Sequence, residues 1–172
     1  MTRSRKGRTP EGARLTHLDR KGQARMVDVS AKPPTLRQAV AAGSIRMSRE
    51  AWRALRSGRA GKGDAVALAR VAGIAAAKRT SEWIPLCHAI PLEHVGVDVR
   101  FGIEGRTIDV EATARARWST GVEMEALVAT ATALLTLYDM AKAIDRGMTI
   151  GRVRLLEKSG GRSGTYVRAG RS

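Results

Sequence analysis

The chain has 172 residues, with 31 lysines and arginines against 16 aspartates and glutamates, a formal net charge of +15 and a single cysteine. One cysteine cannot form an internal disulfide, no Cys/His cluster has zinc-site spacing, and no run approaches the roughly 18 apolar residues that a membrane span needs. The composition therefore favours a soluble, cytoplasmic protein with a hydrophobic core and anionic partners, and it disfavours a disulfide scaffold, a metal-nucleated fold and a secreted protein.

The chain divides into three parts. Residues 1–14 are predicted to be a basic, disordered extension, because residues 1–25 carry eight basic and two acidic side chains with almost no apolar periodicity. Residues 15–164 are expected to form one folded domain, followed by a flexible basic tail over 165–172. Weak contact of the extension with RNA is the main alternative, but one Phe, two Tyr and three Trp offer few stacking platforms for nucleic acid.

Local patterns predict elements through the first half of the domain. Residues 35–47 are predicted to form a strand, because Ile45 and Met47 are spaced at period two, although the alanines there also suit a helix. Ser48 is placed to cap a short helix. Asp64 is placed to cap a second helix that runs over 64–78.

The second half begins with two alternating runs. Residues 95–101 and 108–118 flank a glycine-containing loop and predict an antiparallel hairpin. A long apolar helix is predicted over 120–146, with Gly147 placed to end it, and a last strand over 150–156. Strands and helices that alternate around a hairpin predict an α+β fold with two layers, an antiparallel sheet packed by helices.

The first two clusters of residues that could carry chemistry lie outside the segments in which apolar and polar residues alternate. Lys62 is flanked by glycines, and two interpretations are open. The segment is an ordinary turn with a solvated lysine, or the lysine is a cation that contacts a ligand. Leu86, Cys87 and His88 follow a proline and could line a rigid pocket wall. There are three alternatives for this cluster. The histidine and cysteine are inert core residues, or Cys87, His88 and His94 bind zinc, or the cysteine and histidine form a nucleophilic dyad.

The other two clusters belong to the long predicted helix. Glu123, Met124 and Glu125 fall in its first turn, where acids complement the helix dipole or serve a ligand. Asp139 and Lys142 are three residues apart and therefore share a helix face, as a surface ion pair or as an acid/base pair. Lys158 begins a glycine-rich cationic loop that could wrap phosphates.

Taken together and in order, these segments resemble the cyclic pyranopterin monophosphate synthase family (MoaC) of molybdenum cofactor biosynthesis. The similarity runs from about residue 15 to residue 164. Its motif blocks cover residues 26–32, 62–64, 69–74, 76–80, 85–88, 120–127, 137–140 and 153–156.

The resemblance implies a lyase that converts a cyclic dihydroguanosine triphosphate to cyclic pyranopterin monophosphate with release of diphosphate, on a ferredoxin-like fold. Residues 15–164 would then be the catalytic domain. The family's catalytic aspartate corresponds to Asp139, and its essential lysines to Lys62 and Lys142. The expected substrate-binding positions are Leu86, Cys87, His88, Glu123, Met124, Glu125 and Lys158.

The family also implies a homo-oligomer, a hexamer built from dimers, with active sites shared at the dimer interfaces. No metal ligands, redox cofactor, membrane or specific nucleic acid are expected, and a magnesium ion that accompanies the triphosphate is left open. Helix geometry agrees with a shared site, because Glu123 and Asp139 lie sixteen residues, or about 24 Å, apart on one helix. Either that helix breaks or a neighbouring chain supplies one of the two groups.

Three positions depart from the family pattern, namely Ala89 after Cys-His, Ala141 after Asp-Met and Arg162 in the glycine loop. Arg162 keeps the charge of the usual lysine and alters its geometry. Two other functions compete with the lyase, a non-catalytic RNA-binding or ribosome-associated basic domain and a pterin- or nucleotide-binding regulator that lost its chemistry.

Overall fold

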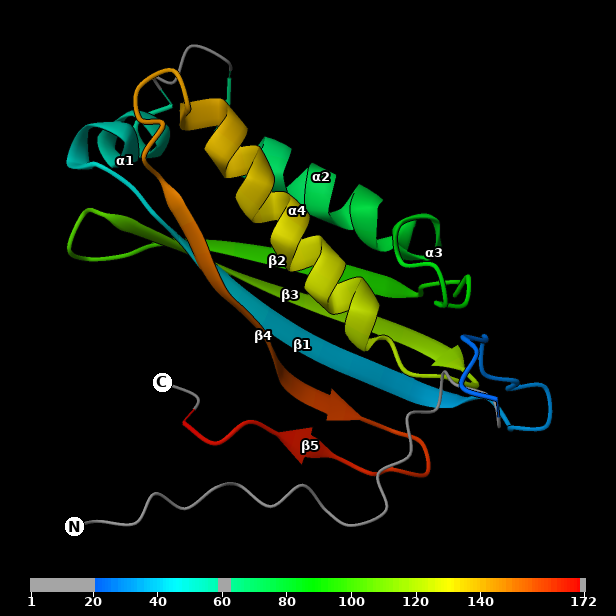
Figure 1. The fold of residues 1–172 in the computed structure, drawn as a ribbon. Helices are drawn as coiled ribbons and strands as arrows, with labels where there is room; N and C mark the ends of the chain where they lie inside the picture. Colours follow the sequence, from blue (N-terminus) through cyan, green and yellow to red (C-terminus); the bar gives the residue numbers. More distant parts are fainter. Residues whose placement is uncertain (1–20, 59–62, 171–172) are drawn as a thin grey trace, which may run out of the picture.

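A computed structural model describes residues 21–58 and 63–170. It confirms the α+β class, with helices packed on one antiparallel sheet (Figure 1). The predicted extension over 1–14 and the residue Lys62 lie outside the described residues. The elements in chain order are β1 Thr35–Arg46, α1 Arg49–Arg56, α2 Ala65–Ala77, α3 Thr80–Trp83, β2 His94–Phe101, β3 Thr107–Trp118, α4 Glu123–Ala141, β4 Thr149–Ser159 and β5 Tyr166–Val167.

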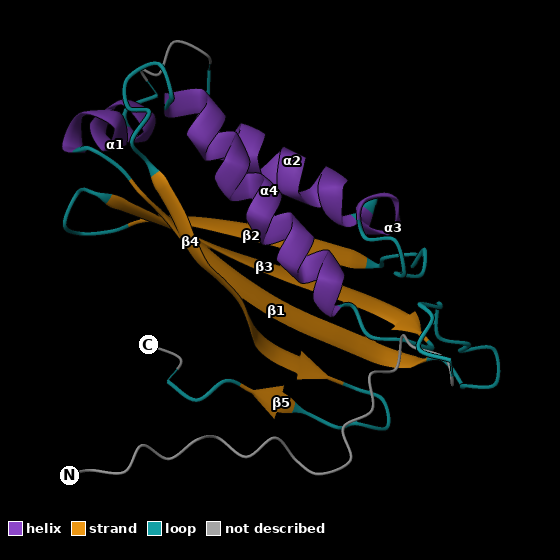
Figure 2. Ribbon diagram, viewed as in Figure 1, coloured by secondary structure: helices purple, strands orange, loops and turns teal. Residues whose placement is uncertain are grey.

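The sheet has the strand order β2-β3-β1-β4-β5, and every neighbouring pair is antiparallel. Helices α2 and α4 cover one of its faces (Figure 2). The centre of that face is built of alanine, since Ala39 and Ala41 of β1 and Ala112 and Ala114 of β3 are fully buried. Small side chains here let the helices approach the sheet closely.

Both predicted helix caps are confirmed. The backbone N–H of Ala51 donates to the Ser48 hydroxyl at 3.2 Å, which starts α1. The N–H groups of Val66 and Ala67 donate to one Asp64 carboxylate oxygen at 2.9 and 3.0 Å, which starts α2. Each cap satisfies backbone donors that a helix start leaves without an intrahelical partner.

Helix α4 is shorter than predicted at both ends. It begins at Glu123 instead of residue 120 and ends at Ala141, so the prediction that Gly147 ends it was wrong. The early C-terminal end is explained by Asp145. Its carboxylate accepts from the backbone N–H of Ser48 at 2.7 Å and from that of Gly147 at 2.8 Å. These bonds tie the chain to the start of α1 and turn it toward β4.

Helix α4 is also long and apolar enough to cross a membrane by length and composition. In the fold it packs against α2, β1 and β3, and Leu134 and Leu137 are fully buried. It runs without interruption from Glu123 to Ala141, so it is the core helix of the domain, and the option of a broken helix is removed.

The predicted hairpin is confirmed as β2 and β3, and the last strand extends further than predicted, to Ser159. After a glycine-rich turn the chain pairs again, with Tyr166 opposite Lys158 and Val167 opposite Glu157. The segment over 165–172, expected to be a flexible tail, therefore contains the short strand β5.

Candidate active site

Two adjoining cavities form a groove at the end of the sheet where β1 and α4 begin and β3 and β4 end. The first, the cationic cavity, has a volume of about 470 Å³, and the second, the Cys-His cavity, about 340 Å³. Four residues line both cavities, Lys32, Thr120, Gly121 and Glu123. The groove is therefore continuous, and one ligand can occupy both cavities.

The start of α4 is fixed by packing against the sheet. Val122 is almost fully buried and Ala126 fully buried, and they contact the alanines of β1 and β3. Val122 offers no side-chain hydrogen bond as a cap, so the position of this helix end depends on the turn before it. Packing and the turn together thus determine where Glu123, Met124 and Glu125 stand in the groove.

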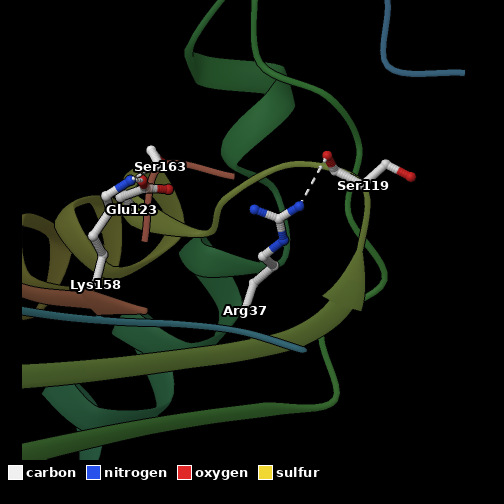
Figure 3. A network of polar contacts seen from close by, with 5 residues as sticks. All are labelled: Arg37, Ser119, Glu123, Lys158 and Ser163. Atoms are coloured by element: carbon white, nitrogen blue, oxygen red, sulfur yellow. Dashed lines mark hydrogen bonds and ion pairs between the residues drawn. The ribbon is translucent and has the colours of Figure 1, made fainter. Parts of the chain in front are cut away.

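The cationic cavity carries four basic side chains, Lys32, Arg37, Lys158 and Arg162, and one acidic side chain, Glu123. Lys158 Nζ donates to the Ser163 hydroxyl at 2.6 Å and lies 3.7 Å from a Glu123 carboxylate oxygen (Figure 3). An excess of positive charge in a hollow of this size suits a ligand with several negative charges, such as a polyphosphate.

The Cys-His cavity is lined by Leu86, Cys87 and His88 from the segment after α3 and by Met124 and Glu125 from α4. The structure thus brings together six of the predicted substrate-binding residues in this cavity, because Glu123 lines both cavities, while Lys158 lies in the adjoining cationic cavity. The cavity mixes apolar and titratable side chains, as sites for heterocyclic ligands do.

The ring of His88 is oriented by the segment before β1. Its Nε2 lies 2.8 Å from the carbonyl oxygen of Val27. A carbonyl can only accept, so Nε2 carries the proton, and in the neutral ring Nδ1 is left as an acceptor. Among residues 21–58 and 63–170, no three His, Cys, Asp or Glu side chains form a group that could hold a metal ion.

Cys87 and Glu125 are adjacent titratable groups. Glu125 is 3% exposed, and burial raises the pKa of its carboxyl to about 7, with an opposing contribution from its own backbone N–H and a further rise from the charge of Glu123. Burial, and then the Glu125 carboxylate, raise the pKa of the Cys87 thiol. The thiol is therefore a poor nucleophile at neutral pH, whereas Glu125 can exchange protons there.

One Glu125 oxygen, Oε2, is buried and has no hydrogen-bond partner within the described part of the chain. A buried carboxyl oxygen without a partner is costly, and proteins keep such groups mainly where a ligand completes them. Its position in the Cys-His cavity makes this oxygen a candidate contact for a donor group of the ligand.

Asp139 and Lys142 stand at the opposite end of α4 from the groove. Asp139 Oδ1 and Lys142 Nζ are 2.5 Å apart, and both side chains are half exposed, at 56% and 52%. The predicted neighbouring pair is confirmed as an ion pair. Within one chain, however, the pair lies about 24 Å along the helix from Glu123, so the chain does not bring all the predicted site residues together.

The predicted lysine at position 62 lies outside the described residues, in the segment that precedes α2. Helix α2 begins at the same end of the helix layer where α4 ends (Figure 1). The predicted site residues that the structure describes fall into two groups, one in the groove and one at the far end of α4.

Sequence reasoning missed Lys32 and Arg37 as site residues. Arg37 lies in β1 on the same face as Ala39 and Ala41, which the helices cover. The sequence did contain a signal for Arg37, because it alternates at period two with apolar residues that are expected to be buried. A charged side chain on the covered face of a strand needs a specific partner.

Comparisons with known proteins find one family and relatives that share one name. The family model described as MoaC family matches residues 26–161. The chain is 59% identical over 156 residues to the cyclic pyranopterin monophosphate synthase of Thermomicrobium roseum, covering 91% of this chain and 94% of that protein. It is 58% identical over 153 residues to the Roseiflexus sp. (strain RS-1) protein of the same name, covering 89% and 97%. The protein of that name from Heliobacterium modesticaldum is 53% identical over 156 residues, covering 90% and 97%.

Proposed function

This chain belongs to the MoaC family, and on that premise we propose that it is a lyase of molybdenum cofactor biosynthesis. The proposed reaction converts (8S)-3',8-cyclo-7,8-dihydroguanosine 5'-triphosphate to cyclic pyranopterin monophosphate and releases diphosphate. The observation that carries the proposal is the continuous groove, in which a cationic cavity adjoins a cavity with a titratable, buried glutamate.

The cationic cavity suits the phosphate chemistry. A sugar hydroxyl attacks the innermost phosphorus, a new O–P bond forms, and the P–O bond to the departing diphosphate breaks. The hydroxyl proton passes to a base while charge develops on the leaving group. Lys32, Lys158 and Arg162 line the hollow that would receive that charge.

The Cys-His cavity suits the rebuilding of the ring. That rebuilding needs protons to be added and removed, and Glu125, with a pKa of about 7, can do both near neutral pH. Nδ1 of His88 offers a second acceptor, since Nε2 is engaged by Val27. The family resemblance assigns the roles of catalytic aspartate and catalytic lysines to Asp139, Lys142 and Lys62.

We propose further that the working site is built by two chains of a homo-oligomer, in the form of a hexamer of dimers. Continuous α4 separates Glu123 from Asp139, so a second chain must supply the distant group if both act on one substrate. Apolar side chains are also exposed on α2 and α4, namely Leu68 at 46%, Val71 at 64% and Leu135 at 55%. Such exposed side chains on core helices favour cover by another chain.

The deciding experiment incubates the purified protein with the cyclic triphosphate intermediate and follows diphosphate and pterin together. We expect both products in equal amounts without a redox cofactor, and parallel reactions with EDTA or added magnesium measure any role of the metal. We place this reaction in the cytoplasm. RNA binding without turnover would overturn the proposal in favour of the basic-domain alternative.

A further inference from the structure

Arg37 of β1 joins three parts of the chain at the mouth of the cationic cavity. Its Nε donates to the carbonyl oxygen of Trp118 at 3.1 Å. Its Nη2 donates to the carbonyl oxygen of Ser119 at 3.3 Å, the contact drawn in Figure 3. The acceptors are the last residue of β3 and the first residue of the turn before α4, more than 80 residues along the chain. The planar guanidinium thus holds two successive carbonyls at once, where β3 passes into the turn.

The other side of the guanidinium is closed by the glycine loop after β4. Gly161 has a positive φ of 76°, and a Cβ atom built there would collide with Nη1 of Arg37. Glycine is therefore required at this position for two reasons, its backbone conformation and the space that Arg37 occupies. The arginine therefore lies between the turn and the loop and contacts both.

Both segments that Arg37 touches carry residues of the groove. The turn continues within four residues to Glu123, at a helix start that lacks a side-chain cap. The Ser119 hydroxyl donates to the carbonyl oxygen of Lys32 at 2.8 Å, which ties the turn to a third wall. The loop carries Ser163, which accepts from Lys158.

We propose that Arg37 is a positioning residue, which sets the spacing between Glu123 and Lys158 through its two carbonyl contacts and its packing on Gly161. This inference rests on the proposed function for its kinetic readout. It differs from a role as a phosphate ligand, because a ligand acts through charge and a positioning residue through the shape of its donors. A displacement of about 1 Å in such an arrangement can cost on the order of 10²-fold in rate.

Arg37→Lys separates the two roles, because lysine keeps the charge and cannot hold two carbonyls in the same plane. We expect its kcat to fall at least about 10-fold, with KM changed by less than about 3-fold. Gly161→Ala should give the same split by displacing Nη1. The matched control is Gly164→Ala, because Gly164 also has a positive φ, of 65°, but a Cβ there meets nothing within 4 Å. This control should keep kcat within about 2-fold to 3-fold.

The double variant Arg37→Lys with Gly161→Ala should lose no more than the worse single variant, since both changes break one contact. A near-normal kcat in Arg37→Lys, or equal effects of Gly161→Ala and Gly164→Ala, would overturn the inference. A loss confined to KM would instead assign Arg37 to phosphate binding.

Hydrogen exchange keeps the test independent of the proposed function. In the full chain, Arg37→Lys should raise amide exchange over residues 118–122 and 160–164, and Gly164→Ala should leave residues 118–122 unchanged. Calorimetry with inorganic diphosphate measures whether the cavity still binds an anion. An inactive wild type would contradict the proposed function alone, whereas unchanged exchange in Arg37→Lys would contradict the positioning role.

Discussion

At the scale of single residues, Glu125 carries a cost in stability. Burial raises the pKa of its carboxyl from the ordinary 4.5 to about 7, so the folded chain binds this proton more tightly than the unfolded chain. Between these two values the folded state holds more protons, and stability therefore falls as the pH rises through this window. Above about pH 7 the penalty is complete.

Glu125→Gln removes this penalty while it keeps the shape of the side chain. We expect the variant and the wild type to be equally stable near pH 4, and the variant to gain an advantage of at most about 3 kcal/mol by pH 8. Urea unfolding at a series of pH values measures the difference. At pH 7 the variant should also turn over more slowly, since the amide cannot exchange the proton. A stability difference that does not vary with pH would contradict this account.

Two further residues should matter for activity and little for folding. Asp139 is half exposed and its ion pair with Lys142 is worth little to stability, since exposed pairs contribute only about 0–1 kcal/mol. We expect Asp139→Asn and Lys62→Ala each to lose at least about 10²-fold in turnover, with the unfolding temperature nearly unchanged. Circular dichroism and initial rates provide the two measurements. A folded variant with near-normal turnover would remove that residue from the catalytic set.

At the scale of elements, the close packing of α2 on α4 depends on one glycine. A Cβ at Gly73 would come within 2.9 Å of the Ala129 carbonyl oxygen and 3.1 Å of Val97 Cγ2. The contact joins the two helices and strand β2 at one point. Backbone atoms of a packed helix cannot give way without moving the whole helix.

The change in stability caused by Gly73→Ala has a sign that distinguishes helix propensity from helix packing. Helix propensity alone would stabilise the protein by about 1 kcal/mol, because alanine is the better helix former. We expect instead a destabilisation of about 1–3 kcal/mol, from the forced separation of α2 and α4. Chemical unfolding of the variant beside the wild type measures it, and a stabilised variant would show that the helices have room to spare.

At the scale of the whole molecule, a single chain presents two separate groups of predicted site residues. The groove holds Glu123 to Glu125, and the far end of α4 holds Asp139 and Lys142. A second chain related by a twofold axis would generate two equivalent composite sites in each dimer.

Subunit mixing tests this arrangement. Glu123→Ala or Met124→Ala, combined with Asp139→Asn after subunit exchange, should regain part of the wild-type activity, because hybrid dimers contain one site without a substitution. The parents should each be inactive, and a mass-tagged chain confirms exchange. Inactive hybrids after proven exchange, or a fully active monomer in sedimentation, would rule out the shared site.

The sequence by itself determined the longer elements, the caps and the family, while it missed the short helix α3 and the short strand β5. The signals that succeeded are local: the period-two alternation in β2 and β3, the cap residues Ser48 and Asp64, and the apolar run of α4. Each of them predicts the backbone conformation of its own segment. The ordered motif blocks likewise identified most of the residues that line the Cys-His cavity, because the order of motifs along a chain can be recognised without knowing which residues are in contact.

Only the tertiary structure decided how far apart the site residues lie and what surrounds them. The burial that raises the pKa of Glu125, the place of Arg37 between two distant loops, and the end of α4 at Ala141 all depend on contacts between remote segments. Asp145 reaches Ser48 across 97 residues, and Arg37 reaches Trp118 across 81. Local patterns do not encode these distances, because burial and long-range hydrogen bonds arise only when the sheet and its helices have assembled.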